Sequence, residues 1–351
     1  MKILYLYSEI MPYQMEVFKY LVKLGKAEIA VVHWDASDSR LTPYSPDGVN
    51  KVNFYPRSKY DNDALSKFSL KYNPDIVYVS GWQDFGYLLA VRKLKKLGKP
   101  VVSGFDDQWL GSFKQVIGSY FMRLFLRNLF FTHAWISGDQ QYLYAKKMGF
   151  QNGRIIRNLL SCDTGLFHSS SLALHKKEKS YPRTFLYVGS FRHIKGVDIL
   201  IEAYHLYKQK YKGDWNLICV GNGELEGELL HVSGITVIPF STQDVLMNLA
   251  KEVGAFIMPS RLDQWGVAAH EFASAGLPII LSENVGASSS FLIHNYNGYI
   301  YQNNSVDELV KFMLKMSSNG SDDLMEMGRR SKFLSNRISP ELTAASLLSI
   351  L

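Results

Sequence analysis

The chain has 351 residues, of which 47% are hydrophobic and 20% are charged, a composition typical of soluble globular proteins. This length predicts two domains, and the two cysteines, Cys162 and Cys219, are too few and too far apart for a disulfide framework or a zinc site. A formal charge of +7 and a pI of about 9.1 favour anionic partners such as phosphorylated ligands or anionic lipid, whereas the lack of zinc-finger spacing and of RNA-binding aromatic motifs argues against nucleic acid.

The first half of the chain alternates short apolar runs with helical patterns. The first run begins directly after Met1, without the apolar core and cleavage site of a signal peptide, and no window is long enough to span a bilayer. A cytoplasmic, reducing compartment is therefore expected. The predicted strands are 2–7, 28–33, 76–79, 100–103, 134–137 and 154–158, and the clearest helices are 15–24 and 86–97. This alternation predicts a parallel sheet covered on both faces.

Residues 113–131 form an aromatic-rich helical pattern that carries Lys114, Arg123 and Arg127. A basic amphipathic helix of this kind can lie on an anionic membrane surface. The other interpretation is a helix that packs against the sheet of the first half. Both hold if one face is buried and a rim touches lipid.

A Ser- and Lys-rich stretch without apolar periodicity, 168–180, interrupts the alternation and predicts an interdomain linker. The second half then resumes with further strands. These are 184–188, 216–220, 235–238, 255–258 and 279–281, with an edge strand at 298–301. Two Rossmann-like halves of similar size are expected to direct the loops at the carboxyl ends of their strands into a shared cleft, where ligands bind. The expected boundaries are 1–165 for the first domain, 166–182 for the linker and 183–334 for the second domain.

The first strand of the second half runs into a loop that ends at Lys195-Gly196 and contains Arg192, and a helix at 197–207 follows. A glycine turn, two cations and a helix start suit a diphosphate, because the first N–H groups of a helix are free. An ordinary loop with solvated cations explains the same residues. The loop matches neither the Walker A pattern nor G-x-G-x-x-G, which argues against an NTPase or a dinucleotide enzyme.

Two further segments follow strands of the second half. Gly221-Asn222-Gly223 can bring backbone close to a base or phosphate, or can simply form a turn. Residues 259–276 place two carboxylates, Asp263 and Glu271, eight positions apart. Between them lies Trp265-Gly266, where the strand at 255–258 passes into an Ala-rich helix at 267–275. A strand, an acidic turn and a helix with a second acid are typical of a small-molecule site.

In this order, the three segments resemble the donor-binding half of glycosyltransferase family 4, whose members have two Rossmann-like domains in the GT-B fold. The family strings are a Val-Gly-Arg/Ser turn leading to Lys-Gly, a Gly-x-Gly turn, and Pro-Ser followed by Glu-x7-Glu. Here they read Val188-Gly189-Ser190 to Lys195-Gly196, Gly221-Asn222-Gly223, and Pro259-Ser260 with Asp263-x7-Glu271. The resemblance covers roughly residues 154–302, and it implies that a terminal helix within 335–351 returns to the first domain.

The resemblance implies a retaining transfer of a sugar from a nucleoside diphosphate donor, with neither a metal nor another cofactor. Lys195, with Arg192, would hold the diphosphate, Glu271 would bind the ribose hydroxyls, and Asp263 would face the sugar. A carboxylate accepts two hydrogen bonds from a diol, and fixed cations and amides stabilise a departing diphosphate. The implied donor-binding residues are Gly189, Arg192, Lys195, Gly221, Gly223, Phe240, Trp265, Gly266, Val267 and Glu271.

The chain departs from the family pattern at three positions. Asp263 is one methylene shorter than the usual Glu, Ser190 stands where many members have Arg, and Asp106 stands where the family often has His. Asp106 is expected to be catalytic as an acceptor-side carboxylate, together with Asp263 and Lys195, and Asp107 is expected to contact the acceptor. The alternative is that Asp106 and Asp107 cap a helix, since Asp favours that position.

Tyr13 and Gln14, which follow the first strand, are expected to shape the acceptor pocket; the alternative is a simple loop capped by Pro12. The expected function is a retaining, metal-independent transfer from a UDP- or GDP-sugar to a saccharide or to a polyprenyl- or otherwise lipid-linked saccharide. The expected context is bacterial surface polysaccharide or glycolipid synthesis, in the cytoplasm and at the inner face of the cell membrane. The alternatives are a non-catalytic nucleotide-sugar-binding protein, or an epimerase or hydrolase of the same fold. The sequence specifies neither base, sugar, linkage nor subunit number.

Overall fold

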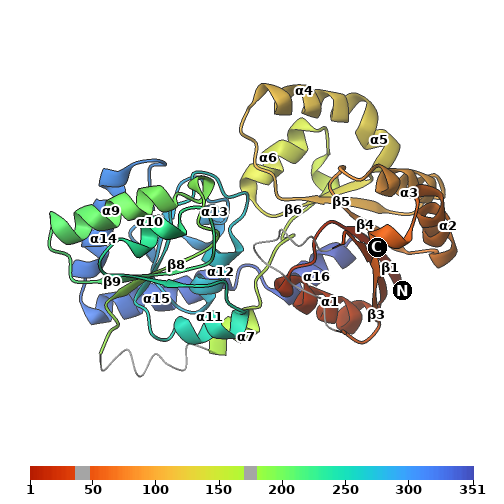
Figure 1. The fold of residues 1–351 in the computed structure, drawn as a ribbon. Helices are drawn as coiled ribbons and strands as arrows, with labels where there is room; N and C mark the ends of the chain where they lie inside the picture. The colour runs from red at the N-terminus through yellow and green to blue at the C-terminus, as the bar shows by residue number, and fades with distance from the viewer. Residues whose placement is uncertain (36–47, 170–179) are drawn as a thin grey trace. The chain divides into compact units, whose positions relative to one another are not determined.

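A computed structural model describes residues 1–35, 48–169 and 180–351 and divides them into two compact units (Figure 1). The first unit consists of Met1–Ser161 and Pro340–Leu351, and the second of Cys162–Ser339. Residues between 161 and 165, expected in the first domain, belong to the second unit, where helix α7 (Thr164–Ser169) packs against α12 (Val267–Ser274). Residues 170–179, most of the predicted linker, lie outside the described residues.

The first unit contains a seven-stranded parallel sheet with the order β3-β2-β1-β4-β5-β6-β7. Its strands are β1 (Lys2–Tyr7), β2 (Glu28–His33), β3 (Val52–Pro56), β4 (Ile76–Ser80), β5 (Val101–Phe105), β6 (His133–Ile136) and β7 (Ile155–Ile156). The predicted strands are confirmed, and β3 is an additional edge strand. The central strands are almost fully buried because helices cover both faces of the sheet, which explains their runs of Val, Ile and Leu.

The helices of the first unit connect these strands and cover them. They are α1 (Pro12–Gly25), η1 (Arg57–Lys59), α2 (Asn62–Tyr72), α3 (Phe85–Lys96), α4 (Phe113–Phe121), the π-helical turn η2 (Met122–Leu126), α5 (Arg127–Phe130), α6 (Asp139–Lys147), η3 (Asn152–Arg154) and α16 (Pro340–Leu348). The single helix predicted at 113–131 is thus three consecutive segments. The chain's last helix, α16, packs against its first, α1, so both ends of the chain belong to the first unit.

The second unit contains a six-stranded parallel sheet with the order β10-β9-β8-β11-β12-β13. Its strands are β8 (Thr184–Val188), β9 (Asn216–Val220), β10 (Ile235–Ile238), β11 (Ala255–Met258), β12 (Ile279–Ser282) and β13 (Gly298–Tyr301). Its further helices are η5 (His193–Lys195), α9 (Val197–Gln209), α10 (Glu226–Leu230), α11 (Gln243–Leu249), α13 (Ser288–Phe291), α14 (Val306–Ser318) and α15 (Ser321–Ser335). Every predicted strand is present, including the edge strand β13, so the prediction of two Rossmann-like parallel-sheet domains is confirmed.

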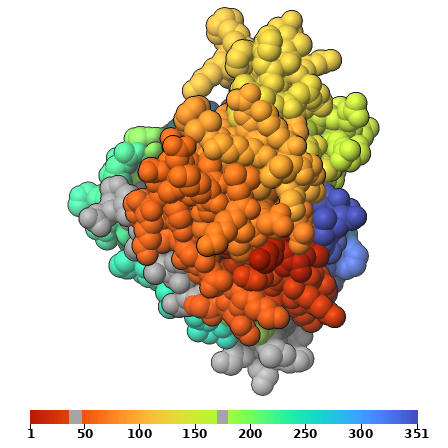
Figure 2. Space-filling view, turned by 90° about the vertical axis from the view of Figure 1, so that its right-hand side faces the viewer, coloured from red at the N-terminus to blue at the C-terminus, as the bar shows by residue number. Residues whose placement is uncertain are grey.

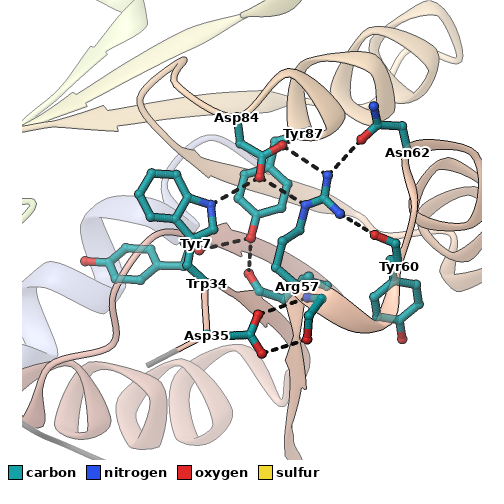
Figure 3. Close-up of polar contacts among 10 residues, drawn as sticks. Tyr7, Trp34, Asp35, Arg57, Tyr60, Asn62, Asp84 and Tyr87 are labelled. Atoms are coloured by element: carbon teal, nitrogen blue, oxygen red, sulfur yellow. Dashed lines mark hydrogen bonds and ion pairs between the residues drawn. The ribbon is translucent and has the colours of Figure 1, made fainter. Parts of the chain in front are cut away.

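A polar cluster fixes the loops after β3 and β4 in the first unit (Figure 3). The Arg57 guanidinium donates to the Asp84 carboxylate at 3.0 Å from Nε, and the Trp34 indole donates to the same carboxylate at 3.1 Å. Asp84 also caps α3 by accepting from the Tyr87 N–H. Burial alone would raise the pKa of Asp84, but its hydrogen bonds, led by that from Arg57, hold the pKa below the usual value. The cluster satisfies its own charges and is therefore structural.

Candidate functional site

Two loops meet at the carboxyl ends of the neighbouring strands β8 and β11 in the second unit. Gly196 has φ +68°, and a Cβ at this position would lie 2.0 Å from the carbonyl oxygen of Pro259. The Arg261 N–H donates to the Ile194 carbonyl oxygen at 3.0 Å, which joins the loops a second time. Only glycine allows such a backbone approach in this conformation, so the contact between the loops explains the glycine at position 196.

A partly exposed ion pair reinforces this junction. The Arg261 guanidinium donates to both carboxylate oxygens of Asp198, at 2.6 and 2.7 Å. Burial opposes ionisation of Asp198, but the Arg261 hydrogen bonds outweigh it and lower the carboxyl pKa. Neither residue was singled out from the sequence. The sequence shows an acid in the first turn of α9 and an arginine directly after Pro259-Ser260, but only the fold reveals that these two residues form a pair.

Lys195 and Asp263, predicted to hold the diphosphate and to face the sugar, contact each other directly. Lys195 Nζ lies 2.6 Å from Asp263 Oδ2, and the side chains are only 29% and 12% exposed. The shorter Asp side chain therefore still reaches the cation. The Asp263 N–H donates to the Asn284 carbonyl oxygen, and the Asn284 side chain donates to the Arg261 carbonyl oxygen, so the backbone of this loop is held in place.

Helix α12 begins beside this pair with an open N-terminus. Its N-cap is Gly266, at φ +94°, and no side chain caps the first amides, which include that of Val267. Trp265 is buried, and its indole N–H has no hydrogen-bond partner among the described residues. Free amides and the positive end of the helix dipole favour an anion at this point.

Glu271 lies one turn further along α12 and is 7% exposed. Its Oε1 accepts a hydrogen bond of 2.9 Å from Nε2 of Gln243, the first residue of α11. Burial raises the pKa of Glu271 to about 7 despite that hydrogen bond. Gln243 was not predicted, although it lies three positions after Phe240, which was predicted to bind the donor.

The remaining predicted donor residues lie at the same edge of the second sheet. A Cβ on Gly221 would lie 2.0 Å from the Gly189 carbonyl oxygen, so the loops after β9 and β8 are also in contact. The Phe240 N–H donates to Asn222 Oδ1 at 3.1 Å, which ties the loop after β10 to the Gly221-Asn222-Gly223 turn. Arg192 is exposed, and its guanidinium has no partner among the residues that the structure describes.

The predicted acceptor residues belong to the first unit. Gln14 is buried, and its side-chain oxygen accepts a hydrogen bond of 2.9 Å from the Met11 N–H. Gln14 therefore helps to cap the N-terminus of α1. Burial raises the pKa of the Tyr7 phenol, and the Tyr78 phenol, Tyr13 and Asp106 raise it further, so Tyr13 and Asp106 both lie within electrostatic reach of Tyr7. Tyr13 and Gln14 line a cavity of about 20 Å³, whose other walls include Tyr5, Tyr7, Tyr78, Trp135 and Ser161.

Asp106 and Asp107 do not cap a helix. The next helix, α4, begins at Phe113, and its N-cap is Ser112, whose hydroxyl accepts from the Gln115 N–H. That alternative interpretation is therefore wrong. Asp106 directly follows the carboxyl end of β5, while Asp107 is exposed on the same loop.

The chain is similar to known glycosyltransferases. Residues 173–332 match the family model described as glycosyl transferases group 1. An uncharacterized glycosyltransferase of Haemophilus influenzae is 28% identical over 171 residues, 47% of each chain, and the O-antigen chain mannosyltransferase C of Escherichia coli is 27% identical over 164 residues, 43% of this chain and 42% of that one. The aligned region thus spans less than half the length of these relatives.

Among solved structures, the Anabaena protein HepE in complex with UDP is similar in fold, with a TM-score of 0.73, 15% identity and complete coverage of both chains. The predicted resemblance is confirmed at the level of the broader group, with which family 4 is compatible. The sequence of the second unit is therefore similar to the glycosyl transferases group 1 model, and both units have the Rossmann-like architecture of the GT-B fold.

Proposed function

We propose that the protein transfers a sugar from a nucleoside diphosphate donor to a saccharide or lipid-linked acceptor. One observation carries the proposal: at a single edge of the second sheet, the Lys195 ammonium lies beside the uncapped N-terminus of α12, and Glu271 is buried one turn further on. A cation and free amides suit a diphosphate, and an enclosed carboxylate suits a ribose diol. The matching group 1 model supports the same reading.

In the proposed complex, the donor diphosphate takes the place of Asp263 at Lys195, with the amide of Val267 and the exposed Arg192 as further donors. As the bond to the sugar breaks, negative charge grows on the diphosphate, and these fixed groups stabilise it. Asp263, displaced from Lys195, accepts a hydrogen bond from a hydroxyl group of the transferred sugar. Before the donor binds, the ion pair with Asp263 thus holds the Lys195 side chain in the position in which it later contacts the diphosphate.

The nucleoside half of the donor binds beside the second turn of α12 and the adjacent loops. Glu271 accepts hydrogen bonds from the ribose hydroxyls, while Gln243 holds the carboxylate in place. Phe240, which is 40% exposed, provides an apolar surface for the base. Because HepE binds UDP, UDP-sugars are the first donors to test, followed by GDP-sugars.

The acceptor side of the reaction is assigned to the first unit. Asp106, which acts electrostatically on the buried Tyr7, is proposed as the carboxylate that hydrogen-bonds to the acceptor hydroxyl. Retention is proposed to follow front-face attack, in which the leaving phosphate helps to take the acceptor proton; a double displacement would need a carboxylate nucleophile, for which Asp263 is the candidate. An O-antigen chain mannosyltransferase among the relatives supports synthesis of a surface polysaccharide. We place this reaction at the inner face of the cell membrane as part of the proposal.

The test is release of nucleoside diphosphate from UDP- and GDP-sugars, with and without saccharide or lipid-linked acceptors. Acceptor-dependent release that is lost in Lys195→Ala and kept in Lys67→Ala, an exposed lysine on α2, supports the proposal. Donor binding with no turnover on any acceptor would instead indicate a binding protein. Release of free sugar without an acceptor would indicate a hydrolase.

A further inference from the structure

The segment from α4 to α5, residues 113–130, leaves most of its apolar side chains in solvent. Those of Phe113, Tyr120 and Phe125 are 81%, 66% and 59% exposed, and Ile117, Phe121 and Leu124 are about half exposed. Within the segment, Ser119 and Met122 are buried. Figure 2 shows the segment, in gold to yellow, standing out from the body of the first unit. We call these six apolar side chains the α4–α5 surface.

The charged side chains within the segment itself have one sign. Lys114 and Arg123 are exposed and Arg127 is half-buried, while the sequence has no Asp or Glu between Asp107 and Asp139. Contiguous exposed apolar surface rimmed by charge marks a binding site rather than an ordinary solvent face. Aromatic and aliphatic side chains combined with Lys and Arg, without acids, are complementary to a lipid surface of negative charge.

We propose that the α4–α5 surface inserts into the headgroup region of an anionic bilayer. The aromatic side chains enter the boundary between headgroups and acyl chains, and Lys114 and Arg123 lie against the lipid phosphates. The attachment is interfacial, since no described helix is long and apolar enough to cross a membrane. Only the role of this attachment, which is access to a lipid-linked acceptor, rests on the proposed function.

Sedimentation of the whole chain with vesicles tests this proposal without donor or acceptor. We expect binding to phosphatidylcholine vesicles that contain roughly one third phosphatidylglycerol, and much weaker binding to phosphatidylcholine alone. The triple variant Phe113→Ser, Tyr120→Ser and Phe125→Ser should bind at least about tenfold more weakly, because it removes most of the apolar area that would be buried in lipid. Phe333→Ser, on α15 and 70% exposed, is the matched control and should bind normally.

Equal binding by the wild type and the triple variant, or no binding to either vesicle, would overturn the proposal. A triple variant that changes from dimer to monomer in light scattering, while the wild type ignores vesicles, would show that the surface joins two copies of the chain instead. Lys114→Gln with Arg123→Gln should remove the preference for phosphatidylglycerol and leave the weak binding to neutral vesicles. Because no step involves sugar transfer, failure of the proposed reaction would not affect these results.

A second inference comes from His270, the neighbour of Glu271 on α12. His270 is fully buried, and its ring stacks on Phe291 with centroids 4.0 Å apart. Its Nδ1 accepts from the Cys162 N–H at 3.1 Å, and its Nε2 lies 3.0 Å from the Ser335 carbonyl oxygen. An N–H donor at Nδ1 requires a lone pair there, so Nε2–H donates to Ser335 and the ring is the neutral tautomer.

The two partners of His270 lie where the chain enters and leaves the second unit. Cys162 is the first residue of that unit, and Ser335 ends α15 four residues before the unit's last residue, Ser339. Ser274, one turn along the same face of α12, contacts Cys162 Sγ at 3.4 Å. One imidazole thus connects both crossings of the chain to the helix that carries Glu271.

We infer that His270 is a positioning residue. It fixes the two segments at which the chain enters and leaves the second unit, at Cys162 and Ser335, relative to the donor-binding helix α12. It contacts neither donor nor acceptor. Its loss should therefore leave donor affinity intact and reduce transfer to the acceptor, whose proposed residues lie in the other unit. The expected change in kcat rests on the proposed function. Hydrogen exchange at the Cys162 amide is a second measurement that is independent of that function.

His270→Leu should keep the donor dissociation constant within about threefold and lower kcat by about tenfold or more, since small displacements are costly in catalysis. Hydrogen exchange at the Cys162 amide should accelerate. His270→Gln, whose amide can still donate to Ser335, should recover part of kcat, and Ser274→Ala, which touches one crossing only, should lose little. Unchanged kcat and exchange in His270→Leu, or a donor affinity that falls in proportion to kcat, would overturn the inference.

Discussion

The strand-end edges of the two sheets differ in chemistry. At the edge of the second sheet, Lys195, the α12 amides and Glu271 are locked together by contacts between loops. At the edge of the first sheet, Asp106 and Tyr13 lie among buried phenols, and the α4–α5 surface is open to solvent. One edge is preorganised for a compact polyanion, and the other unit combines a small pocket lined mainly by aromatic side chains with an exposed apolar surface. Two similar sheets thus support two different kinds of recognition.

The largest expected effect comes from removing the positive charge of Lys195 at the edge of the second sheet. Lys195→Ala should lower kcat/KM roughly 100- to 1,000-fold, because it removes a fixed cation from the departing diphosphate. Steady-state kinetics with a saturating acceptor measures the change. Lys67→Ala, which removes a positive charge from the first unit, should change kcat/KM less than about twofold, and an equal loss in both variants would mean that overall charge, not the site, is responsible.

Gly196→Ala should destabilise the protein by about 2–3 kcal/mol or more, since it adds a backbone clash with Pro259 to the cost of a left-handed conformation. Gly111→Ala is the matched control in the first unit. It has the same φ of +68° but nothing closer than 4.0 Å to its Cβ, so only about 1–2 kcal/mol is expected. Urea unfolding measures both. Equal losses would show that the loops are not in tight contact.

Asp106→Asn should lower kcat by about tenfold. This is a small effect for the loss of a general base, because the leaving phosphate also helps to deprotonate the acceptor hydroxyl. Donor affinity, measured by titration calorimetry, should not change, since Asp106 lies in the first unit. A weaker donor affinity in this variant would contradict the division of roles between the two units.

The smallest effect concerns pH. Burial raises the pKa of Glu271 from 4.5 to about 7, so the folded state binds more protons than the unfolded state between these values. The stability that this group contributes is full below about pH 4.5 and is lost as the pH rises through about 7. Glu271→Gln should therefore be more stable than the wild type at pH 8 and show a flatter profile in thermal unfolding.

Asp84 in the first unit provides the opposite case. Its pKa is lowered, mainly by Arg57 against the opposing effect of burial, so its contribution is present above the ordinary carboxyl pKa and is lost as the pH falls. Asp84→Asn should therefore be less stable than the wild type at pH 7, and the difference should shrink in acid. The same sign of pH dependence for both variants would contradict these environments.

The sequence predicted the strands well and their side-chain pairings poorly. Apolar runs identified the buried strands because parallel sheets are covered on both faces, but β3, with the mixed run Val52–Pro56, is an edge strand and lacked that signal. The glycine turns and both acids of the 259–276 segment were found from local pattern. The Lys195–Asp263 pair, the Gln243–Glu271 bond and the Arg261–Asp198 pair join positions 28 to 68 residues apart, so only the fold brings them together.

The central claim is that the edge of the second sheet binds a nucleoside diphosphate through Lys195 and Glu271. Titration calorimetry of the whole chain with UDP, and then with GDP, tests it most directly. We expect saturable binding of one nucleotide per chain, weakened at least about tenfold by Lys195→Ala and unchanged by Lys67→Ala. No binding of either nucleotide, or equal affinity in the wild type and Lys195→Ala, would contradict the claim.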